Sequence, residues 1–430
     1  MIKIYDTMTR SLRDFVPLTE NVVNMYVCGP TVYNYIHIGN ARSAVAFDTI
    51  RRYFEYCGYT VNYISNFTDV DDKIIKAANE AGISTKELSD KFIAAFMEDT
   101  GQLGIKPATQ NPRVINYMDE IIAFVSTLVD KGFAYVSEGD VYFRVAKSNN
   151  YAKLANKTLE DLEIGASGRT DAETERKENP LDFALWKAAK EGEVSWDSPW
   201  GPGRPGWHIE CSVMATEILG DTIDIHGGGV DLEFPHHTNE IAQSEAKTGK
   251  TFANYWMHNG FVNVDNEKMS KSLGNFVTVH DMLQTVDGQV LRFFLATQQY
   301  RKPINFTEKA IHDAEVNLKY LKNTHSLPLT EQVNQAELQT YLDAFQEAMD
   351  DDFNTANGVT VLFDMAKWIN SGNYDQTVKD AFEKMLQVFG IVFEEEVLDE
   401  DIEKLIEERQ AARANKDFAT ADRIRDELAE

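Results

Sequence analysis

Short apolar runs alternate with helical patterns between residues 22 and 110. The runs at 22–27 and 61–65 predict strands, and the stretch 41–56 between them predicts a helix. The apolar residues of that stretch recur at three- and four-residue spacing: Ala44, Phe47, Ile50 and Phe54. Another helical pattern begins at Asp71. Strand, helix and strand at this spacing predict a βαβ unit of a parallel sheet.

The middle of the chain carries a different pattern. A helix is predicted over 112–131, with Asn111 as its N-cap, a proline at its first position and Gly132 just past its end. Residues 133–145 (FAYVSEGDVYFRV) have a Gly-Asp pair in their turn region and predict a small antiparallel piece. We therefore interpret 112–195 as an insertion between two halves of one sheet.

Beyond residue 310 the pattern is helical to the end of the chain, and no strand is predicted there. The charge run at 394–408 is typical of a linker and a solvated helix face. The expected organisation is an α/β domain, interrupted by an insertion and followed by an all-α helical bundle. By residue number we expect the two halves of the α/β domain at 1–111 and 196–275, the insertion at 112–195, a linker region at 276–310 and the helical domain at 311–430.

Composition narrows the class of protein. With 430 residues, 43% of them hydrophobic and 26% charged, the chain is typical of a globular protein of several domains. No apolar run approaches the ~20 residues of a membrane span, and the N-terminus lacks a secretory h-region, so a cytoplasmic protein is expected. The net charge of −27 disfavours nucleic-acid binding by the chain as a whole, although it leaves room for a basic patch on one element.

Two segments carry candidate nucleotide chemistry. His37 and Gly39 stand where the first predicted strand passes into its helix, and the N–H groups and dipole of a helix N-terminus favour phosphate. A glycine admits a nucleotide without a Cβ in the way, and His37 can donate to phosphate oxygens. Downstream, residues 266–276 (NEKMSKSLGNF) place Lys268 and Lys271 three apart among small residues. This is typical of a mobile loop that brings cations to a polyphosphate.

Either segment alone is a weak signal, but the pair resembles the HIGH and KMSKS sequences of class I aminoacyl-tRNA synthetases. The resemblance implies a doubly wound parallel-sheet (Rossmann-type) catalytic domain with ATP in its crevice. The implied ATP contacts are His37, Gly39, Asn40, Lys268 and Lys271. His37, Asn40 and the two lysines would act in catalysis by position and charge. Asn40 stands where the family usually has its last histidine, and its amide can still donate a hydrogen bond.

A second set of residues has the donor types of a metal site. The three cysteines, Cys28, Cys57 and Cys211, are too few and too scattered for a disulfide framework. Cys28 ends the first predicted strand, and His236 and Glu240 lie four apart, which places them on one helix face. Thiolate, imidazole and carboxylate are zinc ligands. Because no CxxC pair is present, two buried thiols and a histidine in the first turn of a helix remain the alternative.

Several segments together resemble the cysteinyl-tRNA synthetase family: YVCGPTVYNYIHIG, NFTDVDDKIIKAA, GRPGWHIECS, FPHHTNEIAQSE, KMSKSLGNF and DDFNTANGVTVLFD. The resemblance covers most of the chain. It implies one zinc ion, held by Cys28, Cys211, His236 and Glu240, that binds the thiolate of the substrate cysteine. Mg²⁺ would arrive with ATP. His237 lies in the same motif and could instead orient a ligand or the substrate.

The resemblance also implies contacts to the amino acid. Trp207 would pack against the bound cysteine, while Thr68, Asp231 and the backbone of Gly29 would hold its amino and carboxylate groups. Trp207 could equally be a tryptophan at the rim of the core. We assign three nearby acidic residues to a helix N-cap and first turn rather than to binding: Asp69, Asp71 and Asp72.

The implied zinc has a chemical reason. Cysteine and serine differ by one atom, and shape alone would separate them by only ~1–3 kcal/mol. Zinc binds a thiol as thiolate, whereas a serine hydroxyl stays protonated and is a much poorer ligand. The insertion at 112–195 looks too short for an editing domain, so we predict none.

The helical end resembles the tRNA- and anticodon-side domain of the family. The implied partners are tRNA-Cys, ATP and L-cysteine, and the implied state is a monomer. The end of the chain carries cations suited to phosphate contact: Arg409, Arg413, Lys416, Arg423 and Arg425. Alternatively, these cations pair internally with Glu407, Glu408 and Asp422. The chain stops at RDELAE, where family members commonly continue, so the family's short mixed C-terminal element is expected to be missing.

The implied reaction is ATP-dependent activation of L-cysteine and its transfer to tRNA-Cys. A mycothiol-type ligase that joins activated cysteine to a small amine would share the same ligands and nucleotide segments, but the long helical region argues against it. A silent tRNA-binding paralogue should have lost lysines or ligands. A nucleotidyltransferase of the same superfold would not need Cys211, His236 and Glu240.

Overall fold

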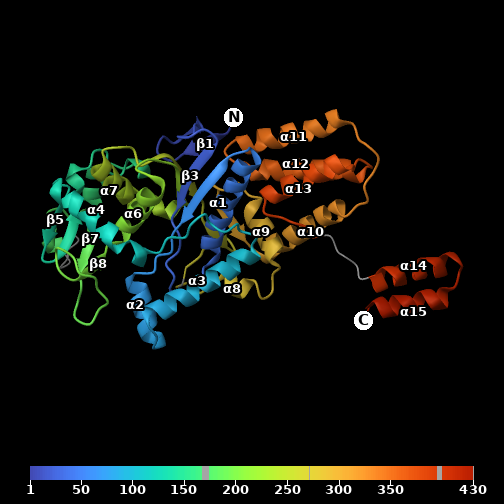
Figure 1. The fold of residues 1–430 in the computed structure, drawn as a ribbon, viewed down its shortest axis with the longest axis horizontal. Helices are drawn as coiled ribbons and strands as arrows, with labels where there is room; N and C mark the ends of the chain where they lie inside the picture. Colours follow the sequence, from blue (N-terminus) through green and yellow to red (C-terminus); the bar gives the residue numbers. More distant parts are fainter. Residues whose placement is uncertain (167–173, 271, 395–399, 430) are drawn as a thin grey trace. The chain divides into compact units, whose positions relative to one another are not determined.

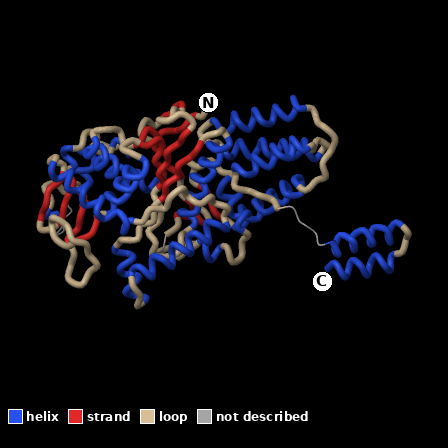
Figure 2. The backbone as a smooth tube through the Cα atoms, viewed as in Figure 1, coloured by secondary structure: helices blue, strands red, loops and turns tan. Residues whose placement is uncertain are grey.

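The computed structural model describes residues 1–166, 174–270, 272–394 and 400–429. Contacts divide the chain into two compact units, Met1–Ile391 and Val392–Glu430. The larger unit contains strands both at its centre and in the insertion, as Figure 2 shows in red. None of the described helices combines the length and apolar character that a membrane crossing requires.

The centre of the larger unit is a four-stranded parallel sheet (Figure 1). Its order is β10 (Ala253–Asn259), β9 (Ile223–Gly229), β3 (Val22–Val27) and β4 (Thr60–Ser65). All three pairings are parallel. The chain builds outward from β3 to β4 and, in its second half, from β9 to β10, so the winding reverses between β3 and β9. Open α/β sheets bind ligands at the carboxyl ends of the strands at such a point. The predicted doubly wound α/β fold is confirmed.

Helix α1 (Ile38–Tyr56) follows β3 and begins three residues before the predicted start, with His37 as its N-cap. It contacts β4, β9 and β10 of the sheet. Of the four apolar residues at the predicted spacing, Phe47, Ile50 and Phe54 are buried, whereas Ala44 is half-buried and lines the cavity described below. Two further helices follow β4, α2 (Asp72–Ala81) and α3 (Thr85–Gln102).

The insertion folds around an antiparallel sheet of β5 (Ala134–Ser137), β6 (Asp140–Phe143), β7 (Phe183–Ala188) and β8 (Gly203–Pro205). The predicted antiparallel piece is thus β5 and β6. The sheet continues to residue 205, beyond the expected end of the insertion at 195. Around it lie α4 (Met118–Asp130), α5 (Leu159–Ala166) and 3₁₀ turns at 145–147, 153–155 and 174–176.

The predicted start of the helix at 112 is wrong. A 3₁₀ turn covers 114–117 and α4 begins at Met118. Asn111 does not cap, because its Nδ2 donates to the Ser65 carbonyl over 2.8 Å at the end of β4. The Pro112 carbonyl accepts from the Phe67 N–H over 2.8 Å. The segment therefore runs along β4 instead of turning into a helix, whereas Gly132 does end it, with a φ of +80°.

The second half of the sheet supplies α6 (Trp207–Leu219), a 3₁₀ turn at Val230–Leu232, a π turn at Glu233–His237 and α7 (Thr238–Thr248). A small three-stranded sheet follows, made of β11 (Val262–Val264), β12 (Glu267–Lys268) and β13 (Ile304–Phe306). Helices α8 (Val279–Met282) and α9 (Gly288–Ala296) lie between β12 and β13 in the chain. At the N-terminus, β1 (Lys3–Asp6) pairs with β2 (Ser11–Asp14).

The helical bundle of the larger unit comprises α10 (Glu308–His325), α11 (Gln335–Asp350), α12 (Thr355–Asn370) and α13 (Gln376–Val388). Figure 1 shows α11, α12 and α13 on the opposite side of the parallel sheet from the insertion. The expected boundary at 310/311 falls inside α10. In the smaller unit, α14 (Glu400–Ala414) and α15 (Phe418–Ala429) pack on each other. No strand is found after residue 310 among the described residues, as predicted.

Candidate active site and metal centre

A cavity of about 630 Å³ opens at the carboxyl ends of β3 and β9. Both halves of the catalytic domain line it. Of the residues singled out from the sequence, the cavity wall contains Cys28, Gly29, His37, Gly39, Asn40, Trp207, Asp231 and Lys268. Lys271 lies outside the described residues. The structure thus brings together, at the switch point of the sheet, residues that are up to 240 positions apart in the sequence.

The candidate nucleotide-binding segment around His37 and Gly39, called the nucleotide corner below, is the N-terminus of α1. His37 and Asn40 cap it by accepting a hydrogen bond from each other's backbone N–H. The His37 Nδ1 accepts from the Asn40 N–H over 3.1 Å, and the Asn40 Oδ1 accepts from the His37 N–H over 3.2 Å. Because Nδ1 acts as an acceptor, the proton of the neutral ring is on Nε2, where it can be donated. The side chain of Asn40 therefore has a structural role, because it completes the capping box at the start of α1.

The capping position of the His37 ring leaves no room for a side chain at Gly39. A Cβ at this position would lie 2.9 Å from the Cε1 and Nδ1 atoms of the His37 ring. Such a contact is shorter than real Cβ contacts, so a side chain at position 39 would displace the imidazole from its capping position. From the sequence, only the close approach of a nucleotide was expected to require this glycine.

The two nucleotide segments are joined by backbone pairing. The Ile38 N–H donates to the Val277 carbonyl over 3.1 Å, and the Val279 N–H donates to the Ile36 carbonyl over 2.9 Å. The chain that follows the lysine segment at 266–276 therefore pairs directly with the N-terminus of α1. At its start, the Lys268 Nζ lies 5.5 Å from the centre of the Phe261 ring, in the cavity wall. His37 and Lys268 thus line one cavity.

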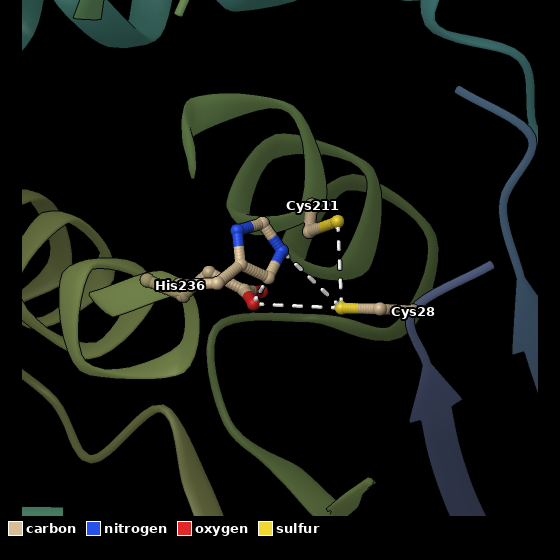
Figure 3. Close-up of side chains that lie close together, drawn as sticks. Cys28, Cys211 and His236 are labelled. Atoms are coloured by element: carbon tan, nitrogen blue, oxygen red, sulfur yellow. Dashed lines mark hydrogen bonds and ion pairs between the residues drawn. The ribbon is translucent and has the colours of Figure 1, made fainter. Parts of the chain in front are cut away.

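Cys28, Cys211, His236 and Glu240 form a cluster beside this cavity, and Figure 3 shows the first three converging from separate elements. The Cys28 Sγ lies 3.6 Å from the Cys211 Sγ, 3.5 Å from the His236 Nε2 and 3.5 Å from the Glu240 Oε2. The His236 Nε2 and the Glu240 Oε2 are 3.3 Å apart.

These separations fit a tetrahedral zinc site. With zinc–sulfur bonds of about 2.3 Å and zinc–nitrogen or zinc–oxygen bonds of about 2.05 Å, tetrahedral angles require donor separations of about 3.8, 3.6 and 3.3 Å for S–S, S–N and N–O pairs. The measured edges follow this order, and all four donor atoms lie within 4.8 Å of one another. Two thiols packed as ordinary core residues would not need an imidazole and a carboxylate at these edges.

The charge balance of the cluster also favours a cation. Burial raises the pKa of the Cys28 thiol well above its ordinary value, and Cys211 and Glu240 raise it further. Burial lowers the pKa of His236 well below its ordinary value, so its ring is neutral and can ligate. Among the described residues, the ion-pair partners of Glu240 are all histidines: His226, His236 and His237. A bound dication would supply the positive charge that two thiolates and a carboxylate need.

Four further histidines, His208, His226, His237 and His258, surround the cluster. The His226 Nε2 lies 2.9 Å from the Glu240 Oε1, and the His208 Nδ1 lies 3.0 Å from the His236 Nδ1. His237 also reaches Cys28, at 3.5 Å, and belongs to an alternative donor set with His226. Its Nδ1 is 2.8 Å from the His258 Nε2. Buried histidines such as His226, on β9, carry no motif of their own, and only the fold brings them to the cluster.

The predicted amino-acid contacts differ in where they lie. Trp207 is 43% exposed, lines the cavity and stacks its ring on His236 with centroids 4.2 Å apart. Thr68 is buried and is not among the residues that line the cavity. Its Oγ1 accepts from the Asn66 Nδ2 over 3.1 Å, and the Asn66 Oδ1 accepts from the Gly29 N–H over 2.9 Å. Asn66, which no sequence pattern singled out, therefore links Thr68 to Gly29.

The three acidic residues after Thr68 are not equivalent. Asp71 caps α2 through a 2.8 Å bond from the Lys73 N–H, and Asp72 lies in the first turn, where it pairs with Arg204. Both assignments are confirmed. Asp69 is not part of the cap, because its Oδ1 accepts from the Ile115 N–H over 3.1 Å and its Oδ2 faces Arg113. It fixes the start of the insertion instead.

Comparison with known proteins identifies the class first. The family model described as the tRNA synthetases class I (C) catalytic domain matches residues 14–316. The fold is similar to that of Mycobacterium tuberculosis methionyl-tRNA synthetase in complex with methionyl-adenylate, with a TM-score of 0.62 and 15% identity over 86% of this chain and 89% of that chain. A similar likeness holds for the Agrobacterium radiobacter K84 LeuRS–tRNA complex, with a TM-score of 0.64, 10% identity and coverages of 87% and 84%. The catalytic fold is that of a class I aminoacyl-tRNA synthetase.

The particular family follows from the sequence relatives. The chain is 95% identical over 429 residues to a cysteine–tRNA ligase of Streptococcus thermophilus (strain CNRZ 1066), covering all of this chain and 96% of that protein. Identity to the cysteine–tRNA ligase of Streptococcus pyogenes serotype M6 is 83% at the same coverage. Family models for a DALR domain and a cysteinyl-tRNA ligase anticodon binding domain match 344–394 and 395–430. The chain belongs to the cysteine–tRNA ligase family.

Proposed function

We propose that this chain activates L-cysteine with ATP and transfers it to tRNA-Cys. In the first step the cysteine carboxylate attacks the α-phosphorus of ATP, which forms cysteinyl-adenylate and releases pyrophosphate. In the second, a terminal ribose hydroxyl of the tRNA takes the cysteinyl group and AMP leaves. The observation that carries the proposal is the cluster of two thiols, an imidazole and a carboxylate beside the cavity that His37 and Lys268 share.

The residues of the nucleotide segments would act by position and charge. The tautomer that the cap imposes on His37 presents an Nε2 proton suited to a phosphate oxygen. The N-terminus of α1, with Gly39 and Asn40 in its first turn, favours the same negative charge. Lys268 and Lys271 would neutralise charge on the polyphosphate, whose Mg²⁺ arrives with ATP. No covalent intermediate on the protein is required.

Cys28, Cys211, His236 and Glu240 would hold one Zn²⁺, which supplies a Lewis acid that binds the substrate thiol as thiolate. Serine, whose hydroxyl stays protonated, would be rejected at this step, so no editing site is needed. Trp207, stacked on His236, would cover the bound side chain. Gly29 and Asp231 would contact the amino and carboxylate groups, with Thr68 supporting Gly29 through Asn66.

We propose a cytoplasmic monomer with tRNA-Cys bound along the helical end of the chain. Support for a reducing compartment comes from the three cysteines, which are all free. Size-exclusion chromatography with light scattering checks the monomer, since a dimer would double the 48.7 kDa mass of one chain.

The test compares two cysteine substitutions. In Cys211→Ser a candidate ligand becomes a hydroxyl, so we expect loss of bound zinc and a fall of at least about 10²-fold in cysteine-dependent ATP–pyrophosphate exchange. Cys57→Ser is the matched control, because Cys57 is an exposed thiol outside the cluster. It should retain zinc and activity.

Charging of a tRNA-Cys transcript with labelled cysteine completes the test. Cysteine-selective charging by the unmodified chain is the expected result. Exchange without charging, combined with product formation on a small amine, would contradict the tRNA acceptor. Equal exchange with serine would contradict thiolate selection.

A further inference from the structure

Arg42 is a buried cation whose place in the molecule the proposed mechanism does not explain. It lies in α1, five residues after His37, and its side chain is fully buried. Every hydrogen bond that it makes among the described residues goes to a backbone carbonyl, and it forms no ion pair with a described carboxylate. A buried guanidinium without an acidic partner is costly, so its four carbonyl contacts require a reason.

The carbonyls come from two separate segments. On one side, the Arg42 Nη1 donates to Gly260 over 3.0 Å and to Phe261 over 3.4 Å. On the other, Nη1 donates to Lys302 over 2.6 Å and Nη2 donates to Gln299 over 3.0 Å. The planar fork of one arginine therefore holds three pieces of chain together: α1, the turn before β11 and the turn before β13. A lysine ammonium cannot reproduce this geometry.

One of these segments belongs to the wall of the cavity that His37 also lines, and the other supports it. Gly260 and Phe261 line the cavity and connect β10 to β11, which pairs with β12, the strand that contains Lys268. The turn at 299–302 precedes β13, which pairs with β11 on its other edge. Arg42 thus lies about one helical turn from the N-terminus of α1 and binds the backbone that leads into β11 and β13, the strands next to Lys268 in the small sheet.

We infer that Arg42 is a positioning residue that fixes the strand containing Lys268 relative to His37 at the N-terminus of α1, so that both residues meet ATP in the cavity that they line. The inference rests on the proposed synthetase activity. It assigns to Arg42 no contact with substrate. The metal cluster lies on elements that Arg42 does not contact through hydrogen bonds, so cysteine binding and ATP use should respond differently to substitution of Arg42.

Arg42→Lys tests the inference with charge and stem retained. We expect the dissociation constant for labelled cysteine and the zinc content to stay within about twofold of the unmodified chain. Per active site, counted by adenylate burst, kcat/KM for ATP in pyrophosphate exchange should fall by about 10²-fold, the effect of a misplacement near 1 Å. A merely structural role would lower Tm and the number of active sites but leave the ATP parameters of each site unchanged.

Gly260→Ala disturbs the same contact at the residues that Arg42 binds, and serves as a second variant in case Arg42→Lys does not fold. A Cβ at Gly260 would lie 2.7 Å from the Lys302 carbonyl carbon and 2.8 Å from the Arg301 oxygen, so it separates the two turns that Arg42 clamps. The same loss for ATP with intact cysteine binding is expected. Arg292→Lys is the control, because Arg292 is equally buried and pairs with Asp48 of α1 over 2.7 Å. Its carbonyl partners, Leu103 and Phe389, do not line the cavity, whereas the Arg42 partners Gly260 and Phe261 do.

The outcomes separate the inference from the proposed function. If the unmodified chain shows no cysteine-dependent exchange, the proposed function fails. If it is active and Arg42→Lys or Gly260→Ala retains wild-type kcat/KM for ATP per active site, the inference is overturned. It is also overturned if Arg292→Lys shows the same ATP-specific loss, since any buried arginine joined to α1 would then have this effect.

Discussion

At the scale of single residues, the four candidate metal ligands depend on neighbouring side chains that hold them in position. The Glu240 carboxylate uses Oε2 toward Cys28 and His236, while Oε1 lies 2.9 Å from the His226 Nε2. The His226 Nδ1 has no hydrogen-bond partner among the described residues, so the geometry favours an Nε2 proton donated to the carboxylate. His226 therefore fixes the rotation of a candidate ligand, which is the usual role of a residue behind a metal ligand.

Replacing His226 by phenylalanine should weaken zinc binding while it preserves the volume of the ring. Without the hydrogen bond Glu240 is free to rotate, and a change of this kind typically costs about 10- to 100-fold in metal affinity. Competition with a chelator measures the zinc dissociation constant directly. His312→Phe, on the exposed side of α10, is the control and should leave it unchanged. Unaltered affinity in His226→Phe would show that Glu240 needs no such support.

At the scale of secondary-structure elements, α1 is joined to the helical bundle through a buried ion pair. Asp48 of α1 accepts from Arg52 over 2.8 Å and from Arg292 of α9 over 2.7 Å. Arg292 in turn donates to the Phe389 carbonyl after α13 over 2.9 Å. Burial alone would raise the pKa of Asp48, but the charges and hydrogen bonds of Arg292 and Arg52 outweigh it and lower that pKa.

The lowered pKa makes the contribution of Asp48 depend on pH. A carboxyl whose pKa is lower in the folded state stabilises the fold above its unfolded pKa of about 3.9, and this is lost as the pH falls through the folded value. Asp48→Asn should therefore destabilise the larger unit by about 3–5 kcal/mol at pH 7, because Arg292 keeps a buried charge without a full partner. The difference from the unmodified chain should shrink below about pH 4.

Urea unfolding of Asp48→Asn and of the unmodified chain from pH 3 to pH 8 measures the difference between their free energies of unfolding. Asp90→Asn is the matched control, since Asp90 also pairs with two cations, Lys86 and Arg113, but is 42% exposed. An exposed pair contributes about 0–1 kcal/mol, so its effect should be small at every pH. A pH-independent destabilisation in Asp48→Asn would show that packing, not charge, holds the joint.

The elements also show what the sequence could and could not predict. Short apolar runs predicted β3 and β4, and three- and four-residue apolar spacing predicted α1, because all three elements pack into the core. The prediction that a helix starts at 112 was wrong. Asn111 and Pro112 have the local pattern of a helix start, but their hydrogen bonds to the segment at the end of β4 hold them in an extended conformation. Residues such as Asn66, His226 and Arg42 carry no local signal, because their partners are distant in the chain: 37 positions for Asn66 and Gly29, and 260 for Arg42 and Lys302.

At the scale of the whole molecule, the net charge of −27 makes cations without an acidic partner important for tRNA binding. In the smaller unit, Arg425 pairs with Asp422 over 3.4 Å and Arg423 with Glu427 over 3.8 Å. The alternative of internal pairing with Asp422 therefore holds for Arg425, whereas Arg423 pairs with Glu427, which was not among the expected partners. Arg413 and Lys416, in contrast, are exposed at the end of α14 and form no ion pair with another described residue.

Reversing both of these charges, in Arg413→Glu with Lys416→Glu, should weaken tRNA binding selectively. We expect KM for tRNA-Cys to rise by about tenfold or more, and the slope of log K against log salt to become shallower by about one unit for each phosphate that the protein no longer neutralises. Cysteine-dependent ATP–pyrophosphate exchange should stay unchanged, because that reaction needs no tRNA. Charging rates over a range of tRNA and salt concentrations measure both quantities.

The matched control lies in the same pair of helices. Arg423→Glu with Arg425→Glu introduces the same change in net charge, but removes cations that the helix already neutralises through Glu427, Asp422 and Asp426. If tRNA binding uses the cations at the end of α14, the first double variant should raise KM several-fold more than the second. Equal effects would mean that the tRNA responds only to the total charge of the molecule, and that the smaller unit presents no specific phosphate contact at Arg413 and Lys416.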